Sequence, residues 1–318
     1  MTVPTQLEYD EARARWRELA GDDPGLGPIA AFHEERLAAL ATSPAPDIAL
    51  DLTPDAATAG IAAGRPLLGE GALTCETEDV AAELRRLARN LSDTSVEGSP
   101  GQRTAERLAA SELDVGPLLD DALNGDAEAI ARAAAAGDYD PTAFAQLLEL
   151  ALQPVLWEAA ARCAALTDVD RWDRGFCPVC GAWPALAELV GAEKRRVLRC
   201  GRCGSRWSWL VLLCPYCGND DHRSLGTLLP EDASSPSASG EARSKDRVDV
   251  CERCHGYLKS VATFHSVPTP QLAAEDAASV HLDVGARERG YTRPGTVDLE
   301  TAGIPRLVRE GRVRAGGD

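Results

Sequence analysis

Residues 176–181 read FCPVCG, and the same Cys-x-x-Cys spacing recurs in CGRCG at 200–204, CPYCG at 214–218 and CERCHG at 251–256. Eight of the ten cysteines therefore lie in four close pairs. A Cys-x-x-Cys turn brings two thiolates close enough to share one metal ion, and two such turns supply the four sulfurs of a closed tetrahedral site. The four pairs therefore predict two metal ions, each bound by four cysteines.

Neighbouring pairs are separated by a length of chain that suits a small ribbon, 19 residues between the first pair and the second. This favours sequential pairing, whereas a cross-braced arrangement of first pair with third and second with fourth fits the spacing too and stays open. The predicted ligands are Cys177, Cys180, Cys200 and Cys203 for one site and Cys214, Cys217, Cys251 and Cys254 for the other. Four thiolates suit Zn and Fe equally well, so the sequence leaves the metal open. Because neither shell has an open position, we expect no metal catalysis and assign no catalytic residue.

The residue after each pair indicates a knuckle of the kind found in zinc ribbons and rubredoxins. Gly181, Gly204 and Gly218 permit the positive φ that aims backbone N–H groups at the sulfurs, and His255 takes that place in the last pair. Strands are expected between the knuckles, at 185–190, 195–198, 206–213 and 257–264. The Ser/Pro/Ala-rich stretch 231–247 is predicted to be a flexible surface loop inside the second ribbon.

The first 173 residues have the apolar spacing of amphipathic helices. Val80, Leu84, Leu87 and Leu91 would line one helix face. Asp140 followed by proline marks the start of another helix, which Pro154 should kink or split. Further helices are expected near 6–20, 28–41, 54–63, 102–112 and 126–136, with loops at 43–53, 92–101 and 137–140. We interpret His33 as a surface or packed residue and Cys163 as a small buried hydrophobe.

These patterns predict a multidomain α+β protein. An all-α domain is followed by two small rubredoxin-like or zinc-ribbon domains and a C-terminal helix. The expected boundaries are 1–173 for the helical domain, 174–212 and 213–268 for the two ribbons, and 269–318 for the C-terminal helix and tail.

Charge and the start of the chain bear on compartment and partners. The formal charge of −17 is concentrated in residues 1–173, where 32 acidic and 13 basic residues give −19, and this half should repel nucleic acid. The opening MTVPTQLEYD has no basic segment followed by an apolar one, and no apolar run approaches the roughly 18 residues of a membrane span. We therefore expect a cytoplasmic protein with reduced cysteines, without a membrane span.

The order of the motifs resembles the FdhE family of formate dehydrogenase accessory proteins. The likeness rests on CPVCG at 177–181, the pair at 200–203 before a Trp-bearing strand, CPYCG at 214–218 and CERCHGYLK at 251–259. EDAASVHLDVGARERGY at 275–291 resembles the closing helix of that family. The resemblance implies a non-enzymatic assembly factor whose partner is the catalytic subunit of a molybdenum or tungsten formate dehydrogenase. It also implies a role in partner binding for Tyr257 and Lys259, which as bare residues are expected to form an exposed pair on a strand.

Two other functions fit parts of the sequence. A nucleic-acid-binding zinc ribbon would use a basic cluster with Trp207 and Trp209 beside it for stacking. The cluster consists of Lys194, Arg195, Arg196, Arg199, Arg202 and Arg206. It would equally well receive an acidic partner or the acidic N-terminal half of the same chain. A rubredoxin-type electron carrier is the second alternative, although two metal sites on a large helical body exceed what a simple carrier needs.

Overall fold

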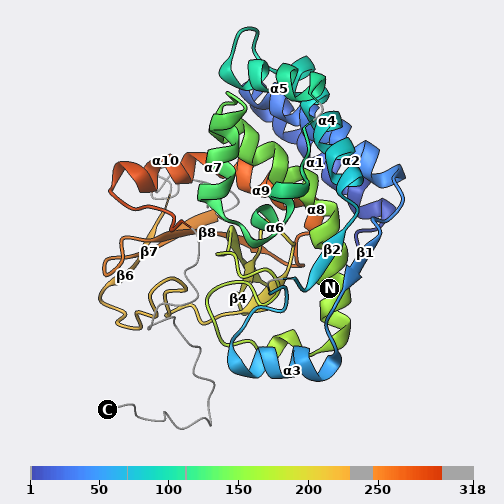
Figure 1. Ribbon diagram of the computed structural model, residues 1–318. Coiled ribbons are helices and arrows are strands. Elements are labelled where there is room, and N and C mark those ends of the chain that lie inside the picture. The colour runs from blue at the N-terminus through green and yellow to red at the C-terminus, as the bar shows by residue number, and fades with distance from the viewer. Residues whose placement is uncertain (1, 70, 112, 230–245, 296–318) are drawn as a thin grey trace.

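The computed structural model describes residues 2–69, 71–111, 113–229 and 246–295 (Figure 1). Helices make up the first half of the chain, and a sheet that contains both groups of four cysteines follows it. Two short helices after the last strand pack back against the first helix and the sheet. The α+β fold class predicted from the sequence is confirmed.

The helical part contains each of the segments predicted as helical, with small shifts at the ends. Its helices are α1 (Gln6–Asp22), α2 (Gly27–Thr42), α3 (Pro54–Ala63), α4 (Thr77–Thr94), α5 (Pro100–Ala110), α6 (Gly116–Asn124), α7 (Ala127–Ala136) and α8 (Pro141–Leu166). Helix α6 was not predicted, and the expected loop 43–53 contains a short strand, β1 (Ile48–Leu50), which pairs with β2 (Leu73–Cys75). The predicted face of α4 is buried at Val80, Leu84 and Leu87.

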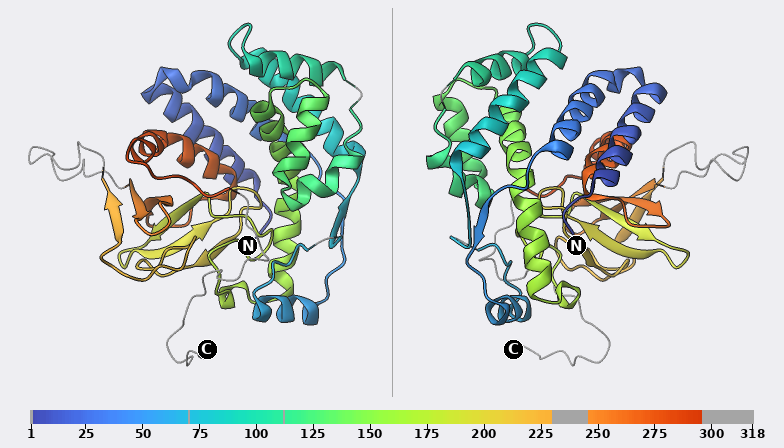
Figure 2. Two further views of the ribbon diagram at one scale, coloured as in Figure 1. Left: turned by 60° about the vertical axis from the view of Figure 1, so that its left-hand side comes forward. Right: turned by 90° about the vertical axis from the view of Figure 1, so that its right-hand side faces the viewer.

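Helix α8 is the central helix of the molecule, and it runs alongside both the other helices and the first ribbon (Figure 2). As predicted, it begins after Asp140, whose carboxylate accepts a hydrogen bond of 2.9 Å from the backbone nitrogen of Ala143. Pro154 does not split it, since the helix is continuous through this residue. Its buried side chains, among them Phe144 and Leu152, show that it is packed along most of its length.

The strands after residue 180 form one six-stranded sheet of order β5-β4-β3-β8-β7-β6. These strands are β3 (Leu186–Val190), β4 (Arg195–Arg199), β5 (Arg206–Ser208), β6 (Leu225–Leu228), β7 (Asp246–Cys251) and β8 (Tyr257–Thr263). Neighbours pair antiparallel except β3 and β8, which pair in parallel and join the two ribbons. The division of the chain into separate domains stays a prediction.

Two sequence expectations in this region need comment. The strand expected over 206–213 ends at Ser208, and Leu210, Val211 and Leu212 are exposed beyond it. Of the predicted surface loop 231–247, residues 231–245 lie outside the described residues, whereas Asp246 and Arg247 begin β7.

Helices α9 (Leu272–Ala278) and α10 (Val280–Glu288) follow the sheet and correspond to the predicted C-terminal helix. The main core is continuous from the helices into the first ribbon, because it includes Leu152, Trp172, Cys177 and Trp207. Among the described residues, no helix has both the length and the apolar character needed to cross a membrane.

Candidate metal centres

The first and second Cys-x-x-Cys pairs come together in one group, which we call site 1. The sulfurs of Cys177 and Cys203 are 3.5 Å apart, those of Cys180 and Cys200 are 3.4 Å apart, and all four lie within 4.8 Å of one another. Sequential pairing of the knuckles is therefore confirmed over the cross-braced alternative.

The local backbone of site 1 follows from its glycines. Gly181 and Gly204 have φ of 77° and 70°, and each donates its N–H to the carbonyl of the first cysteine of its pair, at 3.1 Å in both cases. The backbone nitrogen of Val179 lies 3.4 Å from the sulfur of Cys177 and donates to it. Such N–H donors offset the negative charge that four thiolates place on one ion.

The third and fourth pairs form site 2 in the same way. The sulfurs of Cys214 and Cys254 are 3.7 Å apart, as are those of Cys217 and Cys251. His255 occupies the turn position with φ of 52°, as predicted, where the other knuckles have glycine. The sites differ in exposure, because three cysteines of site 1 have no exposed surface, whereas Cys254 of site 2 is exposed.

Each group has the donor set and the size for a tetrahedral metal ion. Hydrogen bonds from the neighbouring thiols, Cys177 first, hold the pKa of Cys180 well below its usual range. The hydrogen bond from Cys214 is the main cause that lowers the pKa of Cys254 to about 5. Both shifts favour the thiolate, which is the form that binds metal. Both groups can hold a metal ion, and a bound ion would cross-link four points of the backbone.

Site 1 is tied to the helical part by hydrogen bonds on two sides. The backbone nitrogens of Leu67 and Leu68 donate to the carbonyls of Pro178 and Val179, at 3.0 and 2.8 Å. On the other side, the side-chain amide of Gln153 in α8 donates to the carbonyl of Gly201 at 3.0 Å. Hydrogen bonds to the backbone of both knuckles therefore add to the side-chain packing that joins the first ribbon to the helical part.

Arg202 adds a charged connection between the second knuckle and the helices. Its guanidinium contacts the carboxylate of Glu149 at 2.9 Å and donates to the carbonyl of Ala122 at 2.7 Å. The sequence analysis placed this arginine in a basic cluster with three alternative roles: contact with nucleic acid, with an acidic partner or with the protein's own N-terminal half. For Arg202, the last of these interpretations is confirmed.

Other members of the basic cluster are also used within the chain. Arg196 is buried and lies 3.3 Å from Asp249, and Arg199 is buried against Glu188. The two tryptophans expected to stack on bases, Trp207 and Trp209, are only 1% and 3% exposed. Neither ring presents a face to solvent, so the stacking surface suggested by the sequence does not form.

Tyr257 and Lys259 are buried, so the expectation of an exposed pair is wrong. The Tyr257 hydroxyl donates to Asp283 at 2.7 Å, and the Lys259 ammonium lies 2.6 Å from the other oxygen of the same carboxylate. Lys259 also contacts the Asp276 carboxylate at 2.8 Å. Both residues therefore join β8 to α9 and α10, and their role in partner binding stays a prediction. This burial could not be predicted from the sequence, because it depends on partners that lie 17 and 24 residues after Lys259 in the chain.

The remaining singled-out side chains are packing residues. His33 stacks on Trp16 with ring centroids 4.5 Å apart, and burial together with the charge of Arg36 lowers its pKa to about 3. His33 is thus neutral at physiological pH. Cys163 is fully buried in α8, as predicted.

The fold and the two four-cysteine groups define a class of protein, one in which a helical body carries two linked four-cysteine ribbons. Within that class, the sequence is similar to the FdhE homologue of Aquifex aeolicus, with 29% identity over 146 residues, which are 45% of this chain and 47% of the relative. It is also 29% identical over 120 residues to the FdhE homologue of Shewanella baltica strain OS185, covering 37% of this chain and 36% of that protein. The chain thus spans about half the length of the first relative and about a third of the second.

The fold is also shared with a solved protein. The crystal structure of the FdhE protein from Pseudomonas aeruginosa matches with a TM-score of 0.59 and 23% identity, over 92% of this chain and 95% of that one. A search of family models gave no match. The resemblance to the FdhE family seen in the cysteine motifs is confirmed by these similarities.

Proposed function

We propose that this protein is an accessory factor needed to form active formate dehydrogenase, and that it binds the catalytic subunit of that enzyme. The observation that carries the proposal is its sequence similarity to FdhE proteins. The two four-cysteine groups and the shared fold agree with it. The partner would be a molybdenum or tungsten formate dehydrogenase, met in the cytoplasm.

We propose that the eight paired cysteines are metal ligands and that the two ions are structural. Small ribbons bury too little apolar surface to fold alone, and a structural zinc ion contributes on the order of 10 kcal/mol to such folds. Iron in a rubredoxin-like site would serve the same purpose. With all four positions of each site filled by sulfur, a reactant has no place on the metal, which supports a binding protein over an enzyme.

The test is an anaerobic pull-down of the tagged full-length protein from its own host grown with formate, read by mass spectrometry. Recovery of the formate dehydrogenase catalytic subunit is expected. A deletion strain should lose formate dehydrogenase activity and regain it with the wild-type gene. Undiminished activity in the deletion strain would contradict the proposal, and recovery of nucleic acid without dehydrogenase would favour a zinc-ribbon regulator.

A further inference from the structure

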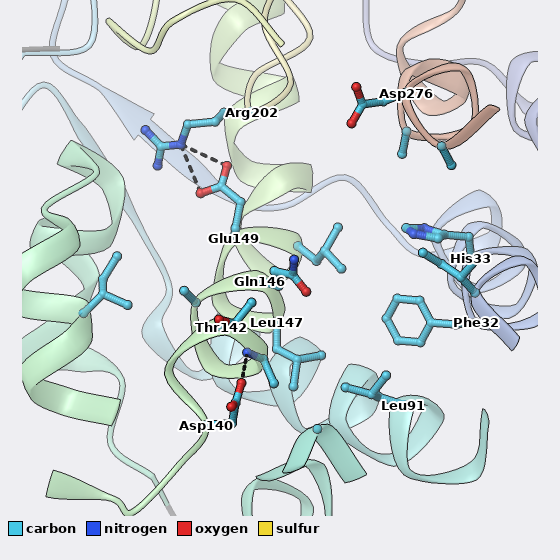
Figure 3. Close-up of a pocket in the computed structure, with 18 of the residues that line it drawn as sticks. Phe32, His33, Leu91, Asp140, Thr142, Gln146, Leu147, Glu149, Arg202 and Asp276 are labelled. Carbon is cyan, nitrogen blue, oxygen red and sulfur yellow. Dashed lines mark hydrogen bonds and ion pairs between the residues drawn. The ribbon is translucent and has the colours of Figure 1, made fainter. Parts of the chain in front are cut away.

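A groove lies between the helices and the first ribbon, with a volume of about 1220 Å³ (Figure 3). Phe32 and His33 of α2 lie on one side of it, and Gln146, Leu147 and Glu149 of α8 lie on the other. The first residues of α10 and the last part of α9 complete the lining. The volume exceeds the roughly 300–1,000 Å³ of most small-molecule sites and suits a peptide segment.

Two large apolar side chains at the edge of the groove are exposed to solvent. Ile29 at the start of α2 is 43% exposed and Val280 at the start of α10 is 52% exposed, and both line the groove. Phe32 and Leu147 lie deeper and are almost fully buried. An exposed apolar rim above a closed apolar floor is the usual arrangement where a helix or an extended segment docks.

Acidic side chains outnumber basic ones along this lining. Among the described residues that line the groove, the carboxylates are those of Asp140, Glu149, Asp276 and Asp283, and the guanidinium is that of Arg202. His33 adds no positive charge, because it is held neutral by burial. Lys259 and Arg293, behind Asp276 and Asp283, offset part of this negative charge. With Glu149 paired to Arg202, one formal negative charge remains at the described lining. The helical half beside it carries −19, so the combined field favours a cationic ligand.

One wall of the groove belongs to site 1. Cys180, Gly181, Ala182 and Trp183, which form the end of the first knuckle, all line it. The position of this wall depends on the four sulfurs of site 1 and on the backbone hydrogen bonds from Leu67 and Leu68. Metal binding at site 1 would therefore support the shape of the groove.

We propose that this groove is the docking surface for a segment of the formate dehydrogenase catalytic subunit that presents apolar side chains together with lysine or arginine. This inference rests on the proposed function and adds to it the place and the chemistry of contact. The apolar rim contributes affinity by burial, and the acidic lining selects the sign of the partner's charge.

The experiment measures the dissociation constant between the purified full-length protein and the catalytic subunit, under anaerobic conditions. Val280→Arg and Val280→Glu introduce long side chains of opposite charge at the rim, and Ile29→Arg and Ile29→Glu repeat the comparison across the groove. The arginine variants should weaken binding by about tenfold or more, and the glutamate variants clearly less, because arginine repels a cationic segment. Leu7→Arg, at an exposed apolar residue of α1 outside the lining, should change binding less than twofold.

The outcomes separate the two proposals. If the wild-type protein does not bind the catalytic subunit, both the proposed function and this inference are refuted. If the wild type binds and all four groove variants bind equally well while keeping two metal ions and the wild-type melting temperature, the docking surface lies elsewhere and only this inference fails. Equal loss in the arginine and glutamate variants would overturn the cationic character of the partner segment. Faster trypsin cleavage at Arg306 and Arg309 in the groove variants would instead assign the groove to this chain's own C-terminal segment.

Discussion

Replacing Lys259 by methionine should lower the free energy of unfolding by about 3 kcal/mol. The Lys259 side chain is fully buried, and its ammonium contacts the Asp283 carboxylate at 2.6 Å, the Asp276 carboxylate at 2.8 Å and the Asp276 carbonyl at 2.7 Å. Methionine has a similar volume, so the loss comes from the unpaired oxygens. An unpartnered buried carbonyl costs about 1–3 kcal/mol, and breaking a buried ion pair costs about 3–5 kcal/mol.

For the broken ion pair, the lower end of the range of about 3–5 kcal/mol applies, because both carboxylates keep other partners. The Asp283 carboxylate retains Arg293 at 2.9 Å and the Tyr257 hydroxyl at 2.7 Å, and the Asp276 side chain is 41% exposed to water. If charge is the cause, Asp283→Asn combined with Lys259→Met should destabilise by less than the sum of the two single changes.

The assay is urea unfolding of the metal-loaded protein followed by circular dichroism, with Arg195→Met as the control at an exposed position. The control should change the free energy of unfolding by less than about 0.5 kcal/mol. A Lys259→Met protein as stable as the control would refute this reasoning. If that stable variant also failed to bind formate dehydrogenase, Lys259 would act in partner binding and not in joining β8 to the C-terminal helices.

Four further outcomes are expected. Cys177→Ser should lower the metal content measured by elemental analysis from two ions per chain to one, whereas Cys163→Ala should keep both. A chelator should remove metal from site 2 before site 1, because site 2 has an exposed sulfur, so a single phase of release would contradict the difference in burial. Gly175→Ala should destabilise the protein by about 2 kcal/mol or more, because the added Cβ would lie 1.8 Å from the backbone oxygen of Pro215. The control Gly101→Ala, in an open position, should be neutral or slightly stabilising; thermal unfolding measures both. Burial by itself raises the pKa of Asp283, but hydrogen bonds from Lys259 and Tyr257 outweigh burial and lower that pKa. The ionised carboxylate therefore contributes stability above about pH 4, and this contribution is lost as the pH falls through the pKa of the folded state. Asp283→Asn should reduce the loss of stability measured by acid titration.

Local signals in the sequence were sufficient for the knuckles, whereas the structure decided which knuckles share a site. A Cys-x-x-Cys turn followed by glycine specifies its own backbone, and the glycines at 181 and 204 have the positive φ that this turn needs. The start of α8 at Asp140 was predictable for the same reason, since the capping contact spans only three residues. Features of this kind depend on neighbours in the chain and not on the rest of the fold.

Exposure of side chains on β8 and the basic cluster could not be predicted in this way. Lys259 and Arg196 look like surface cations in the sequence, but their carboxylate partners come from α9, α10 and β7. Of the two outcomes predicted for Pro154, the split does not occur, because α8 remains continuous while packed against the rest of the core. Long-range packing decided each of these cases.

The sequence by itself therefore determined most helices of the first half, the four knuckles and their eight cysteines, since each is encoded by spacing over a few residues. Only the tertiary structure decided that β3 and β8 join both ribbons in one sheet, that the core continues from α8 into site 1, and that a groove opens between them. The physical reason is that pairing between distant strands and burial between distant elements depend on the whole set of contacts, which no short segment specifies.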